Sequence, residues 1–137
     1  MSFTTRPAPS SAAPGAAFDA LGSLRLPHEL RLTPEQFALV CAENREAVLE
    51  LAADGRVIAI TPTGSEISRR NSELLFQLQQ FAKASGSWKV FESSGGFRLP
   101  DGSVVSPDGS LVSLVRWQAL TANERRSFAP LCPDLVV

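Results

Sequence analysis

Apolar side chains recur at helical spacing in two parts of the chain and predict two helices. The first begins at Thr33, which can cap a helix, with Pro34 at the first helical position and Gln36 placed as the partner in a capping box. The second covers about residues 67–85 and is followed by Gly86, a residue that commonly ends a helix. We expect its apolar stripe to face the core; the stripe consists of Ile67, Leu74, Leu75, Leu78, Phe81 and Ala82.

Short apolar runs separated by turn residues predict strands. Residues 47–51 and 57–60 flank Asp54-Gly55 and form a hairpin. Residues 88–91 and 97–99 predict two further strands, and the turn at Asp101-Gly102 leads to a returning strand over residues 104–105 and 111–115. Proline and glycine within residues 107–109 predict a bulge or an edge in that strand.

The remaining residues complete the expected fold class. Residues 116–132 form a polar linker with a short helix beginning at Thr121, and we expect Trp117, Leu120 and Phe128 to hold this linker against the core. The order of elements predicts an α/β (α+β) domain, with one mainly antiparallel sheet and helices packed against it.

The two ends of the chain differ from the middle. Residues 1–30 are rich in Ala, Pro, Ser and Gly and show little periodicity, which predicts a flexible tail before a domain over residues 31–137. Residues 133–137 predict the beginning of a buried strand, with no turn or charged segment after it. We therefore expect the fold to be incomplete at its C-terminal end.

Composition limits the functions that fit the chain. Its 137 residues are 44% hydrophobic, enough for the core of one domain, and 13 basic against 14 acidic residues give a net charge of −1. A contact with nucleic acid must therefore be local or assisted by a metal. No apolar stretch approaches the ~20 residues that span a membrane, and no signal peptide is recognisable, so we expect a cytoplasmic protein. Cys41 and Cys132 are interpreted as buried free thiols in preference to a disulfide or a metal site.

Three acidic residues are candidates for chemistry. Asp108 lies at the predicted bulge, where a side chain can be redirected, although an aspartate in a turn is also ordinary. Glu66 lies at the beginning of the second helix, where the helix dipole favours a carboxylate for structural reasons; the alternative is an acid that points into a cleft. Glu50 is interpreted as a solvated strand residue.

Phosphodiester hydrolysis needs a hard cation, an activated water and a group that neutralises developing charge. Hard cations take oxygen ligands, chiefly carboxylates, and acids on adjoining strands can converge on one ion. Asp108 fits the first acid. The strand over residues 133–137 is the expected donor of a second acid, but after Asp134 it contains only apolar residues.

An ordered set of short motifs over residues 31–137 resembles the Uma2 family of restriction-endonuclease-like proteins, within the PD-(D/E)XK nuclease superfamily. The motifs are Pro62-x-Gly64-x-Glu66, Arg70-Asn71, Ser93-Ser94-x-Gly96-Phe97-Arg98-Leu99-Pro100, Ser106-Pro107-Asp108, Arg116-Trp117-x-Ala119-Leu120-Thr121 and Cys132-Pro133-Asp134-Leu135-Val136-Val137.

The resemblance implies a Mg²⁺-dependent endonuclease that acts on DNA. Asp108 matches the aspartate of the Pro-Asp motif and would bind the metal, and Glu66 matches a recurrent glutamate that would serve as an additional catalytic acid. The family's next acid would follow directly after Val137, and its lysine would lie further on. Because neither is present, we expect an inactive or impaired endonuclease.

The alternative is a non-enzymatic remnant of such a domain. It would act as an oligomerisation or partner-binding module and pair its C-terminal strand with another chain, since an uncovered strand edge offers unpaired backbone groups. The number of acids around Asp108 and the size of the protein in solution would separate these hypotheses.

Overall fold

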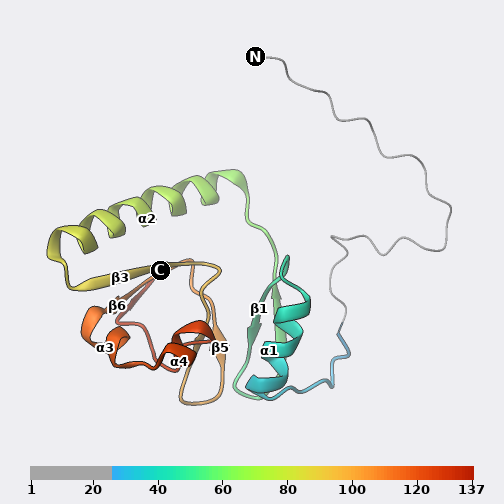
Figure 1. Cartoon of the computed structure of the whole chain (residues 1–137). Coiled ribbons are helices and arrows are strands. Elements are labelled where there is room, and N and C mark those ends of the chain that lie inside the picture. The colour runs from blue at the N-terminus through green and yellow to red at the C-terminus, as the bar shows by residue number, and fades with distance from the viewer. Residues whose placement is uncertain (1–25) are drawn as a thin grey trace, which may run out of the picture.

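The computed structural model describes residues 26–137, and most of the predicted tail, residues 1–25, lies outside the described part (Figure 1). The described part is a mixed α+β domain, as expected. Its helices are α1 (Pro34–Glu43), α2 (Ser65–Ser85), α3 (Leu114–Ala119) and α4 (Ala122–Arg126). Its strands are β1 (Val48–Leu51), β2 (Val57–Ile60), β3 (Trp88–Glu92), β4 (Phe97–Arg98), β5 (Val104–Val105), β6 (Gly109–Ser113) and β7 (Leu135–Val136).

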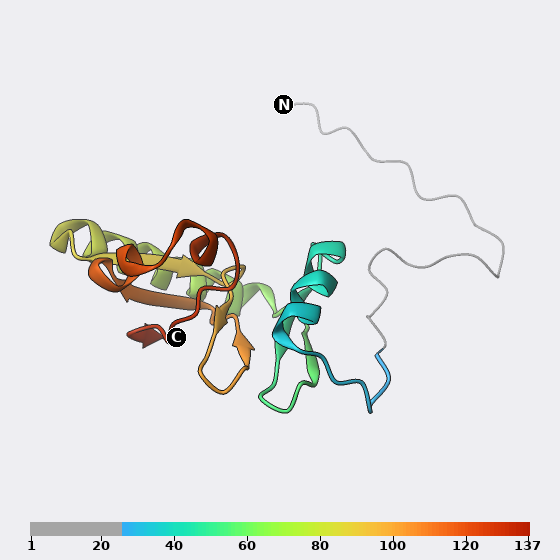
Figure 2. The same ribbon diagram turned by 60° about the horizontal axis from the view of Figure 1, so that its bottom comes forward.

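The first sheet has the strand order β2-β1-β5-β4 and carries α1. The predicted hairpin pairs Val48 with Ile60, and the predicted capping box begins α1, with Thr33 accepting a hydrogen bond from the backbone of Gln36. Phe37 of α1 is fully buried, and the core around it consists of Leu49, Leu51 and Val104. Figure 2 shows α1 (cyan) beside the hairpin.

The second sheet has the order β3-β6-β7 and is covered on both faces. The helix α2 lies on one side of β3 and β6, while α3 and α4 lie on the other (Figure 1). The core on the α3–α4 side consists of Phe97, Val112, Ala129 and Leu131, with Phe91, Trp117 and Leu120 packed against it. Trp117 and Leu120 therefore hold the linker as expected, and Phe128 does so by packing on the first core.

The strands form two antiparallel sheets, so the expectation of one sheet is wrong. We interpreted residues 104–105 and 111–115 as one strand with a bulge, but β5 pairs with β1 and β4, whereas β6 pairs with β3 and β7. Residues 106–108 carry the chain from the first sheet to the second. We name these three residues the crossing segment. The second half of the expected strand also ends early, because Ser113 caps α3 and Val115 is helical.

The apolar stripe of α2 is less buried than predicted. The helix extends over Ser65–Ser85 and ends at Gly86 in the left-handed conformation, as expected. Only Ala82 is buried, whereas Ile67, Leu74 and Phe81 expose 50%, 37% and 54% of their surface. The reason is geometric: α2 packs mainly on β3 and less on β6, so the narrow sheet beneath it covers only part of the stripe.

The strand predicted over residues 133–137 is present but not buried. β7 pairs with β6 through Leu135 opposite Leu111, and it is the edge of the second sheet. Leu135, Val136 and Val137 are exposed, because no described element covers this edge. The strand prediction is confirmed, and the prediction of burial is wrong.

Candidate functional site

A cleft of about 930 Å³ lies between the first hairpin, the N-terminal half of α2 and the crossing segment. The hairpin side contributes residues 43–49 and 59–63. The opposite side is formed by Ser68, Asn71, Ser72, Leu75, Ser93, Ser106 and Asp108. Asp108 is exposed and lines this cleft together with several hydroxyl and amide groups.

Two neighbours, Asn71 on α2 and Gly109 in β6, determine the surroundings of Asp108. The side-chain amide of Asn71, on α2, donates a hydrogen bond of 3.2 Å to Oδ2 of Asp108. Gly109 follows at the beginning of β6, where an added Cβ would lie 2.9 Å from Val137 and 3.1 Å from Leu75. Glycine therefore lets β6 begin close beneath α2, and Asp108 lies beside this close approach.

The structure corrects the interpretation of Glu50 as a solvated strand residue. Its side chain is half-buried, and Oε1 accepts a hydrogen bond of 2.8 Å from the backbone N–H of Ser106. Leu49 and Leu51 point into the α1 core, so Glu50 lies on the opposite face of β1. The signal in the sequence was a single acid within an otherwise apolar strand.

Glu66 is placed differently from Asp108. Its carboxylate forms ion pairs with Arg69 at 2.9 Å and Arg70 at 3.2 Å, all of them exposed. Hydrogen bonds from Arg69 and then Arg70 lower the pKa of Glu66. Glu66 is not among the residues that line the Asp108 cleft. The two predicted site acids therefore occupy different surroundings, and the catalytic role of Glu66 stays a prediction.

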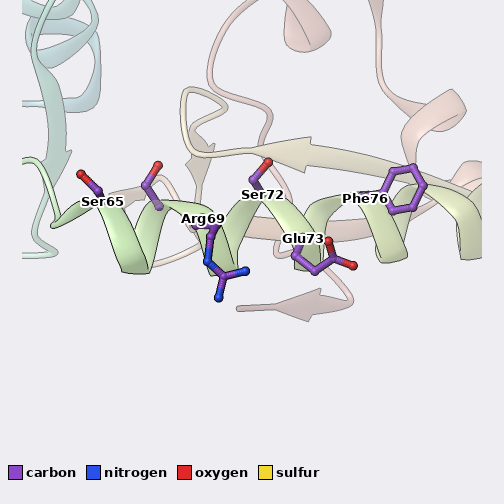
Figure 3. Close-up of a pocket in the computed structure, with 6 residues that line it drawn as sticks. Ser65, Arg69, Ser72, Glu73 and Phe76 are labelled. Carbon is purple, nitrogen blue, oxygen red and sulfur yellow. The ribbon is translucent and has the colours of Figure 1, made fainter.

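A second depression of about 670 Å³ lies along the N-terminal half of α2 (Figure 3). Its residues are Ser65, Ser68, Arg69, Ser72, Glu73 and Phe76. Figure 3 shows Arg69 and Glu73 pointing to one side of the helix, and Ser65 and Ser72 to the other. Because all six residues come from one helix, no second element closes this depression, and we do not assign it a site.

Asp108 and its neighbours in the cleft offer a small set of oxygen donors. Within residues 26–137, no group of three or more His, Cys, Asp or Glu side chains is arranged to hold a metal ion. The Asp108 carboxylate and nearby hydroxyls of Ser93 and Ser106 are oxygen donors of the kind that Mg²⁺ accepts. A Mg²⁺ ion that keeps several waters and binds through one or two carboxylates fits this set.

Neither cysteine contributes to the cleft. Both are free thiols, so Cys41 and Cys132 are not paired with each other. Cys41 is half-buried, and burial raises the pKa of its thiol. Cys132 is exposed, so the expectation that both thiols are buried is wrong for this residue.

Asp134 has a structural role at the entrance of β7. One carboxylate oxygen accepts a 2.8 Å hydrogen bond from the backbone of Ser113, and the other accepts one from Arg116 at the same distance. Arg116 also donates to the carbonyl of Cys132. These contacts join β7 to the end of β6, and we call them the Asp134 clasp. The hydrogen bond from Ser113, followed by that from Arg116, lowers the pKa of Asp134.

The fold and the cleft are consistent with a restriction-endonuclease-like α+β domain. The model of the Uma2 family, described as "Putative restriction endonuclease", matches residues 34–137. The chain therefore belongs to the Uma2 family, and this membership supports a nuclease-like domain. No curated protein matches the chain. Within the described residues, no helix is both long and apolar enough to cross a membrane.

Proposed function

We propose that this chain is a DNA-binding domain of the metal-dependent endonuclease type, in which Asp108 binds Mg²⁺. The observation that carries the proposal is an exposed aspartate at the beginning of β6, oriented by Asn71 and facing a cleft, in a member of the Uma2 family. With a volume of about 930 Å³, the cleft is large enough for a phosphate group and its hydration shell. This assignment follows the PD-(D/E)XK pattern, in which the Pro-Asp motif supplies a metal ligand.

Four residues of the cleft have distinct roles in this proposal. Asp108 holds the cation with the carboxylate oxygen that Asn71 leaves accessible, and Asn71 keeps the carboxylate directed at the cleft. The hydroxyl groups of Ser93 and Ser106 offer hydrogen bonds to water or to a phosphate oxygen. When bound, Mg²⁺ would supply positive charge to the phosphate and acidify a water molecule.

We propose further that the described residues give weak Mg²⁺ binding and little cleavage. Asp108 is the single carboxylate of the crossing segment, and no group of three metal-binding side chains exists within residues 26–137. Removing one electrostatic or nucleophilic group from an active site commonly lowers the rate by about 10² to 10⁴. The described residues are therefore expected to support cleavage only at a low rate.

Glu66 enters this proposal as the additional acid that the family resemblance implies. To serve the cleft, its carboxylate would have to leave Arg69 and Arg70. Exposed ion pairs of this kind contribute little to stability, so the exchange is energetically accessible. The two arginines would then be available for the phosphates of bound DNA.

A second candidate function is a partner-binding or oligomerisation module. The observation in its favour is the exposed apolar surface on α2 and β7, together with the unpaired edge of β7. Measurement of the mass in solution by light scattering separates the two: a stable dimer favours the module, and a monomer that binds metal and DNA favours the nuclease-type domain.

The central test is the Mn²⁺ affinity of the full chain, compared between wild type and Asp108→Ala. We expect Asp108→Ala to weaken Mn²⁺ binding by about tenfold or more, because it removes the only carboxylate of the crossing segment. Glu73→Ala is the matched control, since Glu73 is an exposed acid of α2 that does not line the Asp108 cleft. Plasmid nicking with Mg²⁺ is measured on the same proteins. Equal Mn²⁺ affinity of Asp108→Ala and wild type would rule out Asp108 as a ligand.

A further inference from the structure

The crossing segment joins two sheets that share no hydrogen-bonded strand. On one side, Val104 of β5 pairs with Leu51 of β1; on the other, Gly109 of β6 pairs with Glu92 of β3. Residues 106–108 belong to neither ladder. The direction of the Asp108 side chain therefore depends on how this short segment is held.

Two side chains from distant parts of the chain hold it. Glu50 accepts the backbone N–H of Ser106 at 2.8 Å across 56 positions of sequence, and Asn71 donates to Asp108 at 3.2 Å across 37 positions. Pro107 has no backbone N–H, so only Ser106 and Asp108 can donate from this segment's backbone. Glu50 therefore restrains one of the two available donors, and it does so from the first sheet.

The surroundings of Glu50 favour a restraining role over metal binding. On its face of β1 it stands among Val48, Ile58 and Ile60, and Ile58 is its direct cross-strand neighbour. A half-buried carboxylate among apolar side chains is unfavourable unless it is hydrogen-bonded, and a charged acceptor makes the bond to Ser106 stronger than a neutral one. Glu50 is also absent from the residues that line the cleft.

We propose that Glu50 is a positioning residue for Asp108: it fixes the crossing segment through the backbone of Ser106 and so directs the Asp108 carboxylate at the cleft. This inference rests on the proposed function, in which Asp108 binds the metal. Glu50 itself does not touch the cation. The first sheet thereby contributes to a metal site whose ligand lies at the beginning of a strand in the second.

Two substitutions at position 50 test this role. Glu50→Leu removes the acceptor but suits the apolar face of β1, so it preserves the strand. Glu50→Gln keeps an acceptor oxygen within reach of Ser106 and removes the charge. For each full-length, isotope-labelled variant, NMR gives the hydrogen-exchange rate of the Ser106 amide, and Mn²⁺-dependent line broadening around Asp108 gives the metal affinity.

We expect Glu50→Leu to speed exchange of the Ser106 amide by about tenfold, because the hydrogen bond is lost. The same variant should weaken Mn²⁺ binding about threefold to tenfold, since Asp108 is no longer directed at the cleft. Glu50→Gln should keep Mn²⁺ binding near that of wild type and should speed exchange of the Ser106 amide by less than Glu50→Leu does, because a neutral acceptor still holds this amide, though more weakly. In an Asp108→Ala background, Glu50→Leu should have no further effect on Mn²⁺, because the group that it positions is absent.

Three results would overturn the proposal, and each is distinguishable. Unchanged exchange at Ser106 in Glu50→Leu would show that the hydrogen bond does not restrain the segment. Equal loss of Mn²⁺ affinity in Glu50→Gln and Glu50→Leu would make Glu50 a charged ligand instead of a positioning residue. Unchanged Mn²⁺ affinity in Asp108→Ala would overturn the proposed function itself, whatever the exchange rate at Ser106.

Discussion

The two halves of the domain use their helices in opposite ways. In the first half, α1 has only 10 residues, yet a capping box closes its N-terminus and Phe37 is fully buried against the sheet. In the second half, α2 has 21 residues, but Gly64 provides no side-chain cap and Ala82 is its only buried residue. Each helix therefore has one buried residue, and the longer helix buries the smaller side chain.

The difference shows that burial, more than helix length, decides how strongly an element is fixed. Most of the stability of a helix in a protein comes from packing of its apolar face, and α2 packs only part of that face on β3 and β6. Elements with few buried contacts open more easily. Because α2 carries Asn71, the segment around Asp108 is held on one side by Glu50 of the first sheet and on the other by a helix in which only Ala82 is buried.

The largest expected effect is on stability, when a phenylalanine of each helix is replaced by alanine. Phe37→Ala should lower the free energy of unfolding by about 3–5 kcal/mol, because it empties a fully buried position. Phe81→Ala, on the exposed flank of α2, should lower it by less than about 1 kcal/mol. Urea denaturation of both variants measures the contrast. Equal losses would mean that α2 is as firmly anchored as α1.

The site-bearing part of α2 can be tested by adding an acid. Asn71→Asp removes the amide that orients Asp108 but places a second carboxylate beside it, and we expect the added ligand to outweigh the lost hydrogen bond and to tighten Mn²⁺ binding by about tenfold, or 1.4 kcal/mol. Ser72→Asp is the control, since Ser72 also lines the cleft but makes no described hydrogen bond to Asp108. Titration calorimetry compares the two. An equal gain in both variants would show that overall negative charge, and not the pairing with Asp108, sets the affinity.

The caps of the two helices provide a smaller contrast. Thr33→Ala should lower the free energy of unfolding by about 1 kcal/mol, because the capping box of α1 is lost. Gly64→Ser adds a capping hydroxyl to α2, where a new Cβ meets no atom within 4 Å, and should raise stability by a few tenths of a kcal/mol. Thermal or urea unfolding measures both. A loss of stability in Gly64→Ser would contradict the view that the α2 terminus lacks a cap.

The smallest effect concerns pH and the Asp134 clasp of the second half. The pKa of Asp134 is lower in the folded protein, so the unfolded chain binds a proton at higher pH than the folded one. Its contribution to stability is therefore present above the ordinary aspartate range, around 3.9, and is lost as the pH falls through the lower, folded value. Between about pH 6 and 3, the free energy of unfolding measured with urea should fall less in Asp134→Asn than in wild type. Identical pH profiles would show that the clasp does not contribute.

Elements with local signals were predictable from the sequence. The capping boxes at Thr33 and Thr121, the hairpin around Gly55 and the helix end at Gly86 are all present, because each depends on residues a few positions apart. Asp108 was a candidate through its place before an apolar strand and through the family resemblance. Its exposure to the cleft agrees with that choice, while its role as a metal ligand stays a prediction.

The errors arise where distant parts of the chain meet. The stripe of α2 suits a core by its spacing, but how much of it is buried depends on the width of the sheet beneath. The residues expected to form one strand form two, β5 and β6, because they pair with strands of different sheets. A local sequence pattern does not predict which strand another strand will pair with. The helix α3 was missed because residues 111–115 are apolar except for Ser113, a pattern that also suits a strand, and Ser113 proved to be the helix cap.

The sequence alone determined the class of the domain, its turns and caps, and Asp108 as the leading candidate for chemistry. Only the tertiary structure decided that the strands form two sheets and that Glu50 and Asn71 hold the segment around Asp108. The physical reason is the distance along the chain over which each interaction acts. Dihedral preferences and capping act within one turn of chain, whereas burial and the hydrogen bonds of Glu50 and Asn71 require segments 56 and 37 positions away to arrive at the same place.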